Sequence, residues 1–285
     1  MKPEVSLRAM SQADIPAGLR LCRASLWNQV AEDWRCFLEL DGGGCILAEK
    51  NGKAVGTVAF LRYRPSFSWI AMMLVDPEER GAGIGSQLLT LVLDCLRDQA
   101  CVRLDATPAG EPLYRRFLFV PEYPLVRAKV VASGQRLGPV GQGARFLEPE
   151  DLPAVLALDR RIFGADRGAL LTRFHTGTPW FCSVAMERES LLGYCFGRQG
   201  YLYNHLGPVV AESLAVARAL VSHSLAAHDG MAFAMDVPQS APDWIGWMES
   251  VGFQVERPFL RMRRGHAGKL GEPEWQFGIA GPEFA

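Results

Sequence analysis

The residues with the clearest chemical potential form a glycine-rich stretch, VDPEERGAGIGSQLL, between Val75 and Leu89. An apolar run, WIAMMLV, leads into it and is predicted to form a strand that is buried on both faces. The strand is expected to end at Asp76, because Pro77 has no backbone N–H for strand pairing and fixes φ. Leucines with helical spacing follow and predict a helix. The segment between the strand and this helix is rich in glycine, so few side chains cover its backbone.

Three glycines in this stretch, Gly81, Gly83 and Gly85, let the chain turn tightly and leave its N–H groups accessible. The helix that follows has unpaired first amides and the positive end of its dipole at the same place. This arrangement predicts a binding site for a diphosphate, to which Arg80 can donate a charge-assisted hydrogen bond. The spacing fits neither a P-loop, which needs a lysine after its glycines, nor the dinucleotide-binding G-x-G-x-x-G turn.

The longer pattern MLVDPEERGAGIGSQLL resembles the GNAT acetyltransferase superfamily, and the resemblance extends across residues 1–131. It implies that acetyl-CoA is the cosubstrate, and no metal is expected. It also implies that the strand before the loop pairs with pantetheine through the backbone of Met73 and Val75, with Leu74 between them. The residues implied to form the pyrophosphate loop are Arg80, Gly81, Ala82, Gly83, Ile84, Gly85 and Ser86.

A tyrosine in the segment LDATPAGEPLYRRFLF matches a second feature of the superfamily. GNAT proteins usually have a tyrosine four residues before a Gly-Phe pair, and Tyr114 has this spacing from Leu118 and Phe119. The resemblance implies a catalytic role for Tyr114, which would donate a proton to the leaving CoA thiolate. Leu118 departs from the family pattern, because it replaces the glycine of the pair.

The sequence does not identify the general base that acetyl transfer to an amine requires. An ammonium has no lone pair, so a base must lie within reach, directly or through water. Many relatives carry a carboxylate on the strand before the loop, where this chain has Ala71 and Met72. Glu49, Asp105 and Glu111 are candidates by neighbourhood alone; a water chain or an acceptor of low pKa are the alternatives.

Landmarks that recur in order along the chain predict a duplicated unit. Asp14 and Asp151 are 137 residues apart, and Phe119 and Phe253 are 134 apart. The expected organisation is a first unit at residues 1–131, a glycine-rich linker at 132–143, a second unit at 144–265 and a tail at 266–285. The WQFGIA text of the tail is expected to form a closing strand.

The first unit is predicted to have a mixed α/β fold in the order β-α-α-β-β-β-α-β-α-β. A hairpin is expected at Asn51-Gly52, a strong turn dipeptide. The ranges expected to form strands are 4–10, 68–75, 101–106 and 125–131, besides the two strands of the hairpin. The ranges expected to form helices are 13–26, 30–40, 84–98 and 111–119.

The second unit is predicted to keep the fold and to have lost acetyl-CoA. The residues that replace Arg80, Gly81, Gly83, Gly85 and Tyr114 are Leu214, Ala215, Ala217, Ala219 and Met248. Added Cβ atoms crowd the approach of a phosphate. Its texts FGADRGALL and LGPVVA resemble the C-terminal half of tandem GNAT proteins of the YitH/HolE kind, which implies a degenerate GNAT domain that shapes the acceptor pocket. His205 corresponds to Ala71 and either lines a cleft or is a satisfied strand histidine.

The composition fits a cytoplasmic protein. The chain has 285 residues, of which 49% are hydrophobic, and a net charge of −1, so neither nucleic acid nor a membrane surface is an expected partner. It contains seven cysteines without a C-x-x-C pair, which predicts reduced and mostly buried thiols rather than a zinc site. The sequence does not specify the oligomeric state.

The function predicted from these features is acetyl-CoA-dependent N-acetyl transfer by the first unit to the amine of a small-molecule acceptor. One alternative is a non-catalytic acyl-CoA sensor, which the missing strand carboxylate permits. A second alternative is a scaffold protein with two degenerate sites, and the intact glycines of the first unit argue against it.

Overall fold

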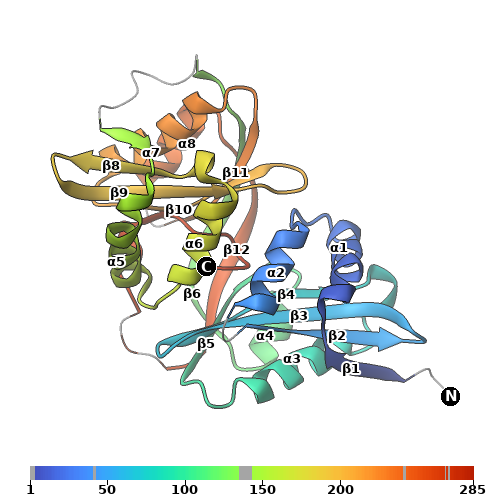
Figure 1. The fold of residues 1–285 in the computed structure, drawn as a ribbon. Coiled ribbons are helices and arrows are strands. Elements are labelled where there is room, and N and C mark those ends of the chain that lie inside the picture. Colours follow the sequence, from blue (N-terminus) through green and yellow to red (C-terminus); the bar gives the residue numbers. More distant parts are fainter. Residues whose placement is uncertain (1–3, 41–42, 135–142, 240–241, 267, 269) are drawn as a thin grey trace.

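The computed structural model describes residues 4–40, 43–134, 143–239, 242–266, 268 and 270–285. It has a mixed α/β fold, as predicted, in which one continuous sheet runs through both units with helices on both faces (Figure 1). The strand order is β1-β2-β3-β4-β5-β12-β6-β11-β10-β9-β8-β7, and β13 pairs with β10. Within the described residues no helix is long and apolar enough to cross a bilayer.

The first unit follows the predicted order of elements. Its strands are β1 (Val5–Ala9), β2 (Gly44–Lys50), β3 (Lys53–Tyr63), β4 (Phe67–Val75), β5 (Cys101–Ala106) and β6 (Val120–Val131). Its helices are α1 (Ile15–Ala24), α2 (Ala31–Glu39), α3 (Ile84–Cys95) and α4 (Glu111–Arg116). The predicted hairpin is confirmed, since Asn51 and Gly52 have φ of 52° and 73°. The predicted helix over 84–98 ends earlier, because Leu96 leaves the helical region at φ −103° and ψ 14°.

The second unit repeats this order. Its strands are β7 (Ala144–Phe146), β8 (Ser183–Glu187), β9 (Ser190–Arg198), β10 (Asn204–Ala211), β11 (Ala232–Pro238) and β12 (Gln254–Gly265). Its helices are α5 (Leu152–Phe163), α6 (Gly168–Gly177), α7 (Leu214–Ala227) and α8 (Pro242–Ser250). The tail adds β13 (Gln276–Gly278), which confirms the predicted closing strand.

The entry into each unit shows the duplication at atomic detail. In the first unit Arg8 donates two hydrogen bonds to the Asp14 carboxylate, both 2.8 Å long. In the second unit Arg145 makes the same pair of bonds to Asp151, at 2.6 and 2.7 Å. Each aspartate also accepts from the backbone N–H three residues before it. Two copies of one structural unit therefore make up the chain.

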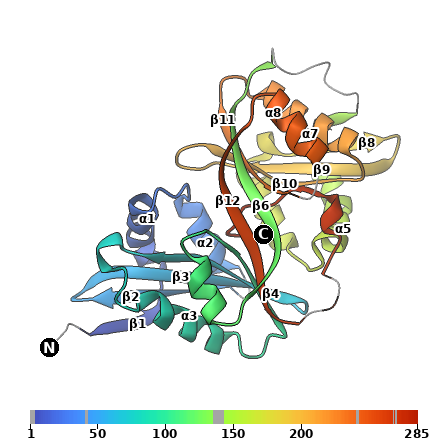
Figure 2. The same ribbon diagram turned by 180° about the vertical axis from the view of Figure 1, so that it is seen from behind.

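The last strand of each unit pairs with strands of the other unit. β12 pairs antiparallel with β5, and β6 pairs antiparallel with β11. β6 and β12 also pair with each other, and they lie side by side at the centre of the sheet (Figure 2). A cut of the chain at residue 131 would therefore not yield two complete sheets, and the boundaries at 131 and 144 stay predictions. Most of the predicted linker lies outside the described residues.

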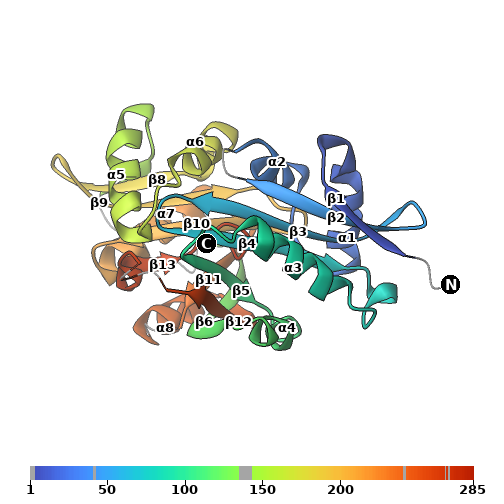
Figure 3. The ribbon, with the colours of Figure 1, turned by 90° about the horizontal axis from the view of Figure 1, so that it is seen from below.

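The helices cover the three larger of four apolar clusters in the described interior. One face of the sheet carries α1, α2, α5 and α6 in a row (Figure 3), and their side chains join in a single core with Trp34, Phe37, Phe163 and Phe284. On the other face α3 covers a core in the first unit, and α7 and α8 cover one in the second. The shared core fixes the two units against each other, which matters for the candidate site because residues of both units meet there.

Candidate active site

The strand before the glycine loop separates from its neighbour partway along. β4 pairs with β5 only through Ser68 and Trp69. A bulge follows, at which Met72 has φ of 52° and its carbonyl accepts a hydrogen bond of 2.9 Å from the Thr57 hydroxyl. Beyond the bulge β4 stays paired with β3, so its other edge is open toward the end of β5.

This open edge presents backbone polar groups of Val75, one of the two residues that the resemblance implies as pantetheine contacts. The Asp76 N–H donates to the Val55 carbonyl of β3 at 2.8 Å. Because hydrogen-bonding groups alternate along a strand, those of Val75 point to the opposite side. The Val75 carbonyl is accordingly within 3.3 Å of Arg80 Nε, which donates to it. A ligand that pairs with Val75 as an added strand would meet its N–H on this open side, whereas its carbonyl already accepts from Arg80.

The glycine loop adopts the conformation that its composition predicts. Gly81 and Gly83 have φ of 81° and 84°, the left-handed region that glycine enters without strain. Gly83 is the N-cap of α3, whose first residue is Ile84. Within the described chain, none of the N–H groups from Gly81 to Ser86 donates a hydrogen bond to another residue. The loop therefore offers a row of amides to an anionic ligand.

The open strand edge and the loop line one groove. The groove has a volume of about 780 Å³, within the range of about 300–1,000 Å³ typical of small-molecule sites. Its far wall is the segment 107–110 that follows β5. The predicted binding residues that line the groove are Met73, Leu74, Val75, Arg80, Gly81, Gly83, Ile84, Gly85 and Ser86. Ala82 is exposed and lies outside it.

An inner cavity continues from the groove and reaches Tyr114. The two share Met73 of β4, Gly110 and Leu113 on the opposite wall, and Arg257 of β12. Tyr114 is buried, and burial raises the pKa of its hydroxyl. Among the described residues that hydroxyl has no hydrogen-bond partner, so a protonated phenol faces the space beside the strand edge.

The leucine that replaces the family's glycine does not change the turn after α4. Leu118 has φ of 64° and an exposed fraction of 73%, so it adopts the left-handed conformation with its side chain in solvent. The corresponding turn after α8 keeps Gly252, with φ of 102°. In both turns the following phenylalanine N–H donates back to the helix, and in the first unit the acceptor is the Tyr114 carbonyl at 3.1 Å.

The three candidate bases named from the sequence all have partners. Glu49 accepts from Arg8 at 2.5 Å, near the sheet edge. Asp105 does line the inner cavity, but both of its oxygens accept from Arg261 at 2.8 Å, and burial raises its pKa. Glu111 accepts at 2.7 Å from an arginine one turn later in α4. The structure thus gives none of them an unshared carboxylate oxygen at the cavity.

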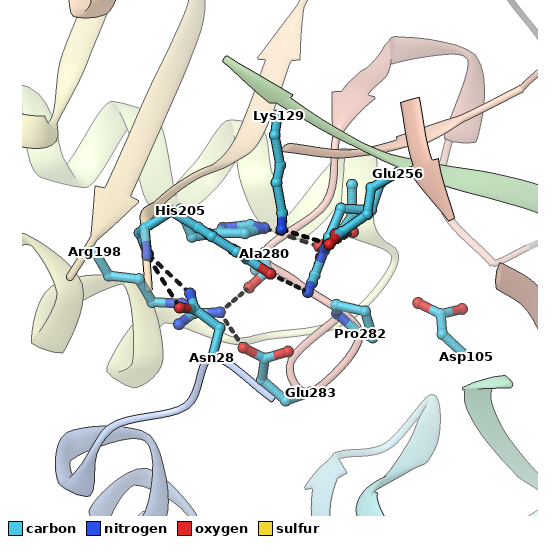
Figure 4. A network of polar contacts seen from close by, with 12 residues as sticks. Asn28, Asp105, Lys129, Arg198, His205, Glu256, Ala280, Pro282 and Glu283 are labelled. Atoms are coloured by element: carbon cyan, nitrogen blue, oxygen red, sulfur yellow. Dashed lines mark hydrogen bonds and ion pairs between the residues drawn. The ribbon is translucent and has the colours of Figure 1, made fainter. Parts of the chain in front are cut away.

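A carboxylate that the sequence analysis missed also lines the inner cavity. Glu283 and its neighbour Pro282 come from the tail, far along the chain from the glycine loop. Figure 4 shows Glu283 beside Arg198 and on the opposite side of Pro282 from Asp105. The sequence analysis predicted a closing strand in the tail, but this prediction did not assign any tail residue to the site.

The second unit has no loop at the place that corresponds to the glycine loop. α7 begins at Leu214, which corresponds to Arg80, whereas α3 begins only at Ile84. Ser213 caps the helix and accepts from the Val216 N–H at 3.3 Å. The first amides of α7 are thus partly satisfied by its own cap, and helix replaces the bare backbone of the first unit.

The gap beside the central strand of the second unit is filled by protein. β10 pairs with β11 only at Asn204 and His205, as β4 does with β5. β13 then enters the gap and pairs with β10 at Val209 and Val210. On its other side the Ile279 N–H donates to a carbonyl of β11 at 2.9 Å. The tail therefore occupies in the second unit the place that is open in the first.

His205 is a buried strand residue rather than a cleft residue, and its Nδ1 has no hydrogen-bond partner among the described residues. Its exposed fraction is 1%, and its Nε2 lies 3.1 Å from Asp236 Oδ2. Burial lowers its pKa. It lines neither the groove nor the inner cavity. The structure thus excludes the predicted cleft position, and within the described chain it satisfies only one of the two ring nitrogens.

Family comparisons assign both units. The model described as "Acetyltransferase (GNAT) family" matches residues 18–118, and the model described as "Acetyltransferase (GNAT) domain" matches residues 155–277. The fold and the two matches define a tandem protein with two GNAT domains. The chain belongs to the GNAT acyltransferases, and it is an enzyme of this acyltransferase class.

Individual relatives cover most of the chain. The holothin acyltransferase of Pseudoalteromonas sp. (strain SANK 73390) is 27% identical over 85% of this chain and 82% of its own length. The uncharacterized N-acetyltransferase YitH of Bacillus subtilis (strain 168) is 23% identical over 84% of each. A solved structure of a Pyrococcus horikoshii protein assigned as an acetyltransferase superposes with a TM-score of 0.82 at 22% identity, over 99% of this chain and 96% of its own.

Proposed function

We propose that the chain is an acetyl-CoA-dependent N-acetyltransferase, in which the first unit binds acetyl-CoA and transfers the acetyl group to the amine of a small molecule. The observation that carries this proposal is the continuity of the groove at the glycine loop with the inner cavity at Tyr114. A long ligand anchored at the loop would bring its far end beside the open edge of β4 and the phenol.

The residues of the first unit have distinct roles in this proposal. The amides between Gly81 and Ser86 bind the diphosphate, and Arg80 adds positive charge. The open edge of β4 at Val75 pairs with the pantetheine arm and supplies an N–H that polarises the thioester carbonyl. Tyr114 donates its proton to the sulfur as the C–S bond breaks. Its raised pKa keeps this proton in place at neutral pH.

A small-molecule acceptor is supported by what surrounds the inner cavity. Besides residues of the first unit, among them Arg127 of β6, its walls include Phe259 of β12 and the tail residues Pro282 and Glu283. β12 of the second unit and the tail thus form part of the cavity wall at the reacting end. An enclosed space of this kind favours a compact amine over the side chain of a folded protein.

The cysteines favour the cytoplasm as the place of action. All seven are free thiols, and six of them are buried, as the sequence predicted. Burial raises the pKa of several of these thiols, which lowers their reactivity. A chain with this many unpaired thiols fits a reducing compartment.

Two measurements on the wild-type chain test the proposal. Acetyl-CoA at 100 times its Kd should add about 2.7 kcal/mol to the free energy of unfolding, seen as a rise in melting temperature. Thiol release should then follow when a primary amine is added from a panel of small amines. A chain that binds acetyl-CoA without thiol release from any amine would be an acyl-CoA sensor instead, and a chain without binding would overturn the loop assignment.

A further inference from the structure

The proposed reaction lacks a base, and within the described part of the chain the inner cavity contains one carboxylate oxygen that has no hydrogen-bond partner. Glu283 has an exposed fraction of 4% and lines the cavity. Its Oε1 accepts a hydrogen bond from Arg198 Nη2, whereas its Oε2 has no hydrogen-bond partner within the described chain. A buried carboxylate oxygen without a donor is costly, so its presence calls for a ligand or a function.

The position of Glu283 is fixed against the strand that would hold the thioester. The carbonyls on either side of it, of Pro282 and Phe284, accept hydrogen bonds from the side chains of Trp69 and Tyr63, at 3.0 and 2.9 Å. Trp69 belongs to β4 and Tyr63 to β3. The tail is thus bound directly to the sheet of the first unit, and the carboxylate keeps a set place relative to the open edge of β4.

The surroundings of Glu283 carry an unbalanced negative charge. Arg198 donates to two buried carboxylates at once, Glu283 and Asp33, and the bond to Asp33 is 3.0 Å long. Figure 4 shows the contact between Arg198 and Glu283. One guanidinium between two carboxylates leaves one negative charge uncompensated when both are ionised. A cation in the cavity would supply the missing positive charge.

Of the other arginines that line the cavity, one is already paired and one lies at its mouth. Arg127 also lines the cavity, but its charge is already paired, because its Nε and Nη2 donate to the Asp236 carboxylate at 2.8 and 2.7 Å. Arg257 makes no ion pair with a described residue, and it lies where the cavity joins the groove. The cavity is therefore polarised, with a positive group toward the glycine loop and negative groups inside.

A second acceptor atom without a donor lies on the same cavity. Gln29 has an exposed fraction of 6%, and its Oε1 has no hydrogen-bond partner among the described residues. Together with Glu283 Oε2 this makes two buried acceptors, one of them anionic, beside a single space. A primary ammonium, with three N–H donors and one positive charge, is the group that satisfies both.

We propose that Glu283 is the general base of the first unit, and that Glu283 and Gln29 together select acceptors that carry a primary aliphatic ammonium. This inference rests on the proposed acetyl-CoA function. Glu283 Oε2 takes one proton from the ammonium, directly or through one water, and the neutral amine attacks the thioester carbonyl. A C–N bond forms and the C–S bond breaks. The sulfur takes the proton of Tyr114, and the second proton lost from nitrogen replaces it on the phenol.

The test is a pH profile of Glu283→Gln with acetyl-CoA and the amines ethanolamine, putrescine, tyramine and glucosamine. The amide still accepts from Arg198 but cannot take a proton. We expect kcat/KM for the best amine to fall about 100-fold at pH 7 and the loss to shrink above pH ~9, where the amine is itself deprotonated. The Kd of acetyl-CoA should change by less than about twofold. Glu274→Gln, an exposed glutamate of the same tail, is the matched control and should keep the wild-type profile.

A second variant covers the case in which Glu283→Gln does not fold. Gln29→Leu removes the other acceptor, and we expect KM for the amine to rise about tenfold while kcat and the acetyl-CoA Kd stay near wild type. Wild-type turnover by Glu283→Gln across the pH range would overturn the inference, as would an unchanged KM in Gln29→Leu. A wild-type chain that binds acetyl-CoA but acetylates none of the four amines overturns it too and leaves the acetyl-CoA site standing. Absence of acetyl-CoA binding defeats the proposed function itself.

Discussion

The two units build the same gap beside their central strands and fill it differently. In the first unit β4 leaves β5 after Trp69, and the gap opens into a groove bordered by the glycine loop. In the second unit β10 leaves β11 after His205, and β13 of the tail occupies the gap. An unpaired strand edge is a liability in a folded protein, so one that stays open is informative. The open gap is the place where we propose that acetyl-CoA binds.

The segments beside the two gaps also differ, since the first is a loop with unpaired amides and the second is helical. Gly81 and Gly83 hold the first loop in left-handed conformations with its amides unpaired. The second unit has a helix from Leu214 onward, capped by Ser213. In the second unit the helix replaces the row of unpaired amides, and the tail strand fills the gap beside it. The tail also contributes to the cavity of the first unit, because tail residues after β13 line that cavity.

The largest effect that sharpens this comparison is expected from Gly83→Val. The variant places a branched side chain over the amides of the loop, at a φ of 84° that costs about 1–2 kcal/mol for a non-glycine residue. We expect acetyl-CoA affinity to fall on the order of 1,000-fold, or about 4 kcal/mol, measured by calorimetry. Gly230→Val is the matched control, since Gly230 has φ of 79°, equally open surroundings and a place in the second unit. Normal binding by Gly83→Val would place the site elsewhere.

Tyr114→Phe is the next test, because the second unit has Met248 at the matched position. Loss of the phenol should lower kcat about 100-fold, or about 2.7 kcal/mol, and leave the acetyl-CoA Kd within about twofold of wild type. Single-turnover thiol release measures the rate. Met248→Leu, a swap of similar volume in α8, should leave turnover unchanged. Equal rates for Tyr114→Phe and wild type would remove the proposed proton donor.

Asp33→Asn tests the buried charge that distinguishes the first unit, since Leu170 takes the matched place in the second. Burial raises the pKa of Asp33 to about 6, with Arg198 opposing and Glu283 adding to the shift. The folded chain therefore binds the proton of the Asp33 carboxyl more tightly than the unfolded chain does. The stability that this protonation contributes is lost as pH rises from about 4 through 6. Urea unfolding should show this loss, on the order of 2 kcal/mol, shrink in Asp33→Asn.

Asp151→Asn in the second unit is the control with the opposite sign. Its hydrogen bonds from Arg145 hold the pKa of Asp151 below its usual range, so its contribution is lost only as pH falls below about 4. The slope between pH 4 and 6 should stay as in wild type. The same slope in Asp33→Asn as in wild type would show that Asp33 is ionised throughout.

The smallest effect is expected from Leu118→Gly, which makes the first turn like the second. Relief of the left-handed leucine gains about 1–2 kcal/mol, and the flexible glycine in the unfolded chain costs about 0.4–1 kcal/mol. We expect a net gain near 0.5 kcal/mol in the free energy of unfolding. Gly252→Leu should instead destabilise, since its φ of 102° suits leucine less well than 64° does. A loss of stability in Leu118→Gly would show that the Leu118 side chain makes a stabilising contact.

The local features of the first unit could be predicted from the sequence because short-range rules determine them. The Asn51-Gly52 turn, the end of β4 at Asp76 and the helix start at Ile84 all follow from residue chemistry within a few positions. The spacing of repeated residues likewise predicted the duplication, which the paired Arg–Asp bonds of the two units show in the structure.

The contacts between the units could not be predicted in the same way. β6 and β12 have the same length and matching positions in the two units, so either strand fits beside β5, and periodicity does not name a partner. The place of Glu283 depends on Trp69 and Tyr63, which lie more than 200 residues earlier in the chain. A sequence pattern records which residues form a strand or a turn, but not which distant surface they meet.

The stoichiometry of acetyl-CoA binding tests the contrast between the two units most directly. Titration calorimetry on the full chain should give one acetyl-CoA per chain, and Gly83→Val should abolish that single event. Two binding events per chain, or one that survives in Gly83→Val, would contradict the account, because the gap closed by β13 would then bind as well as the open one.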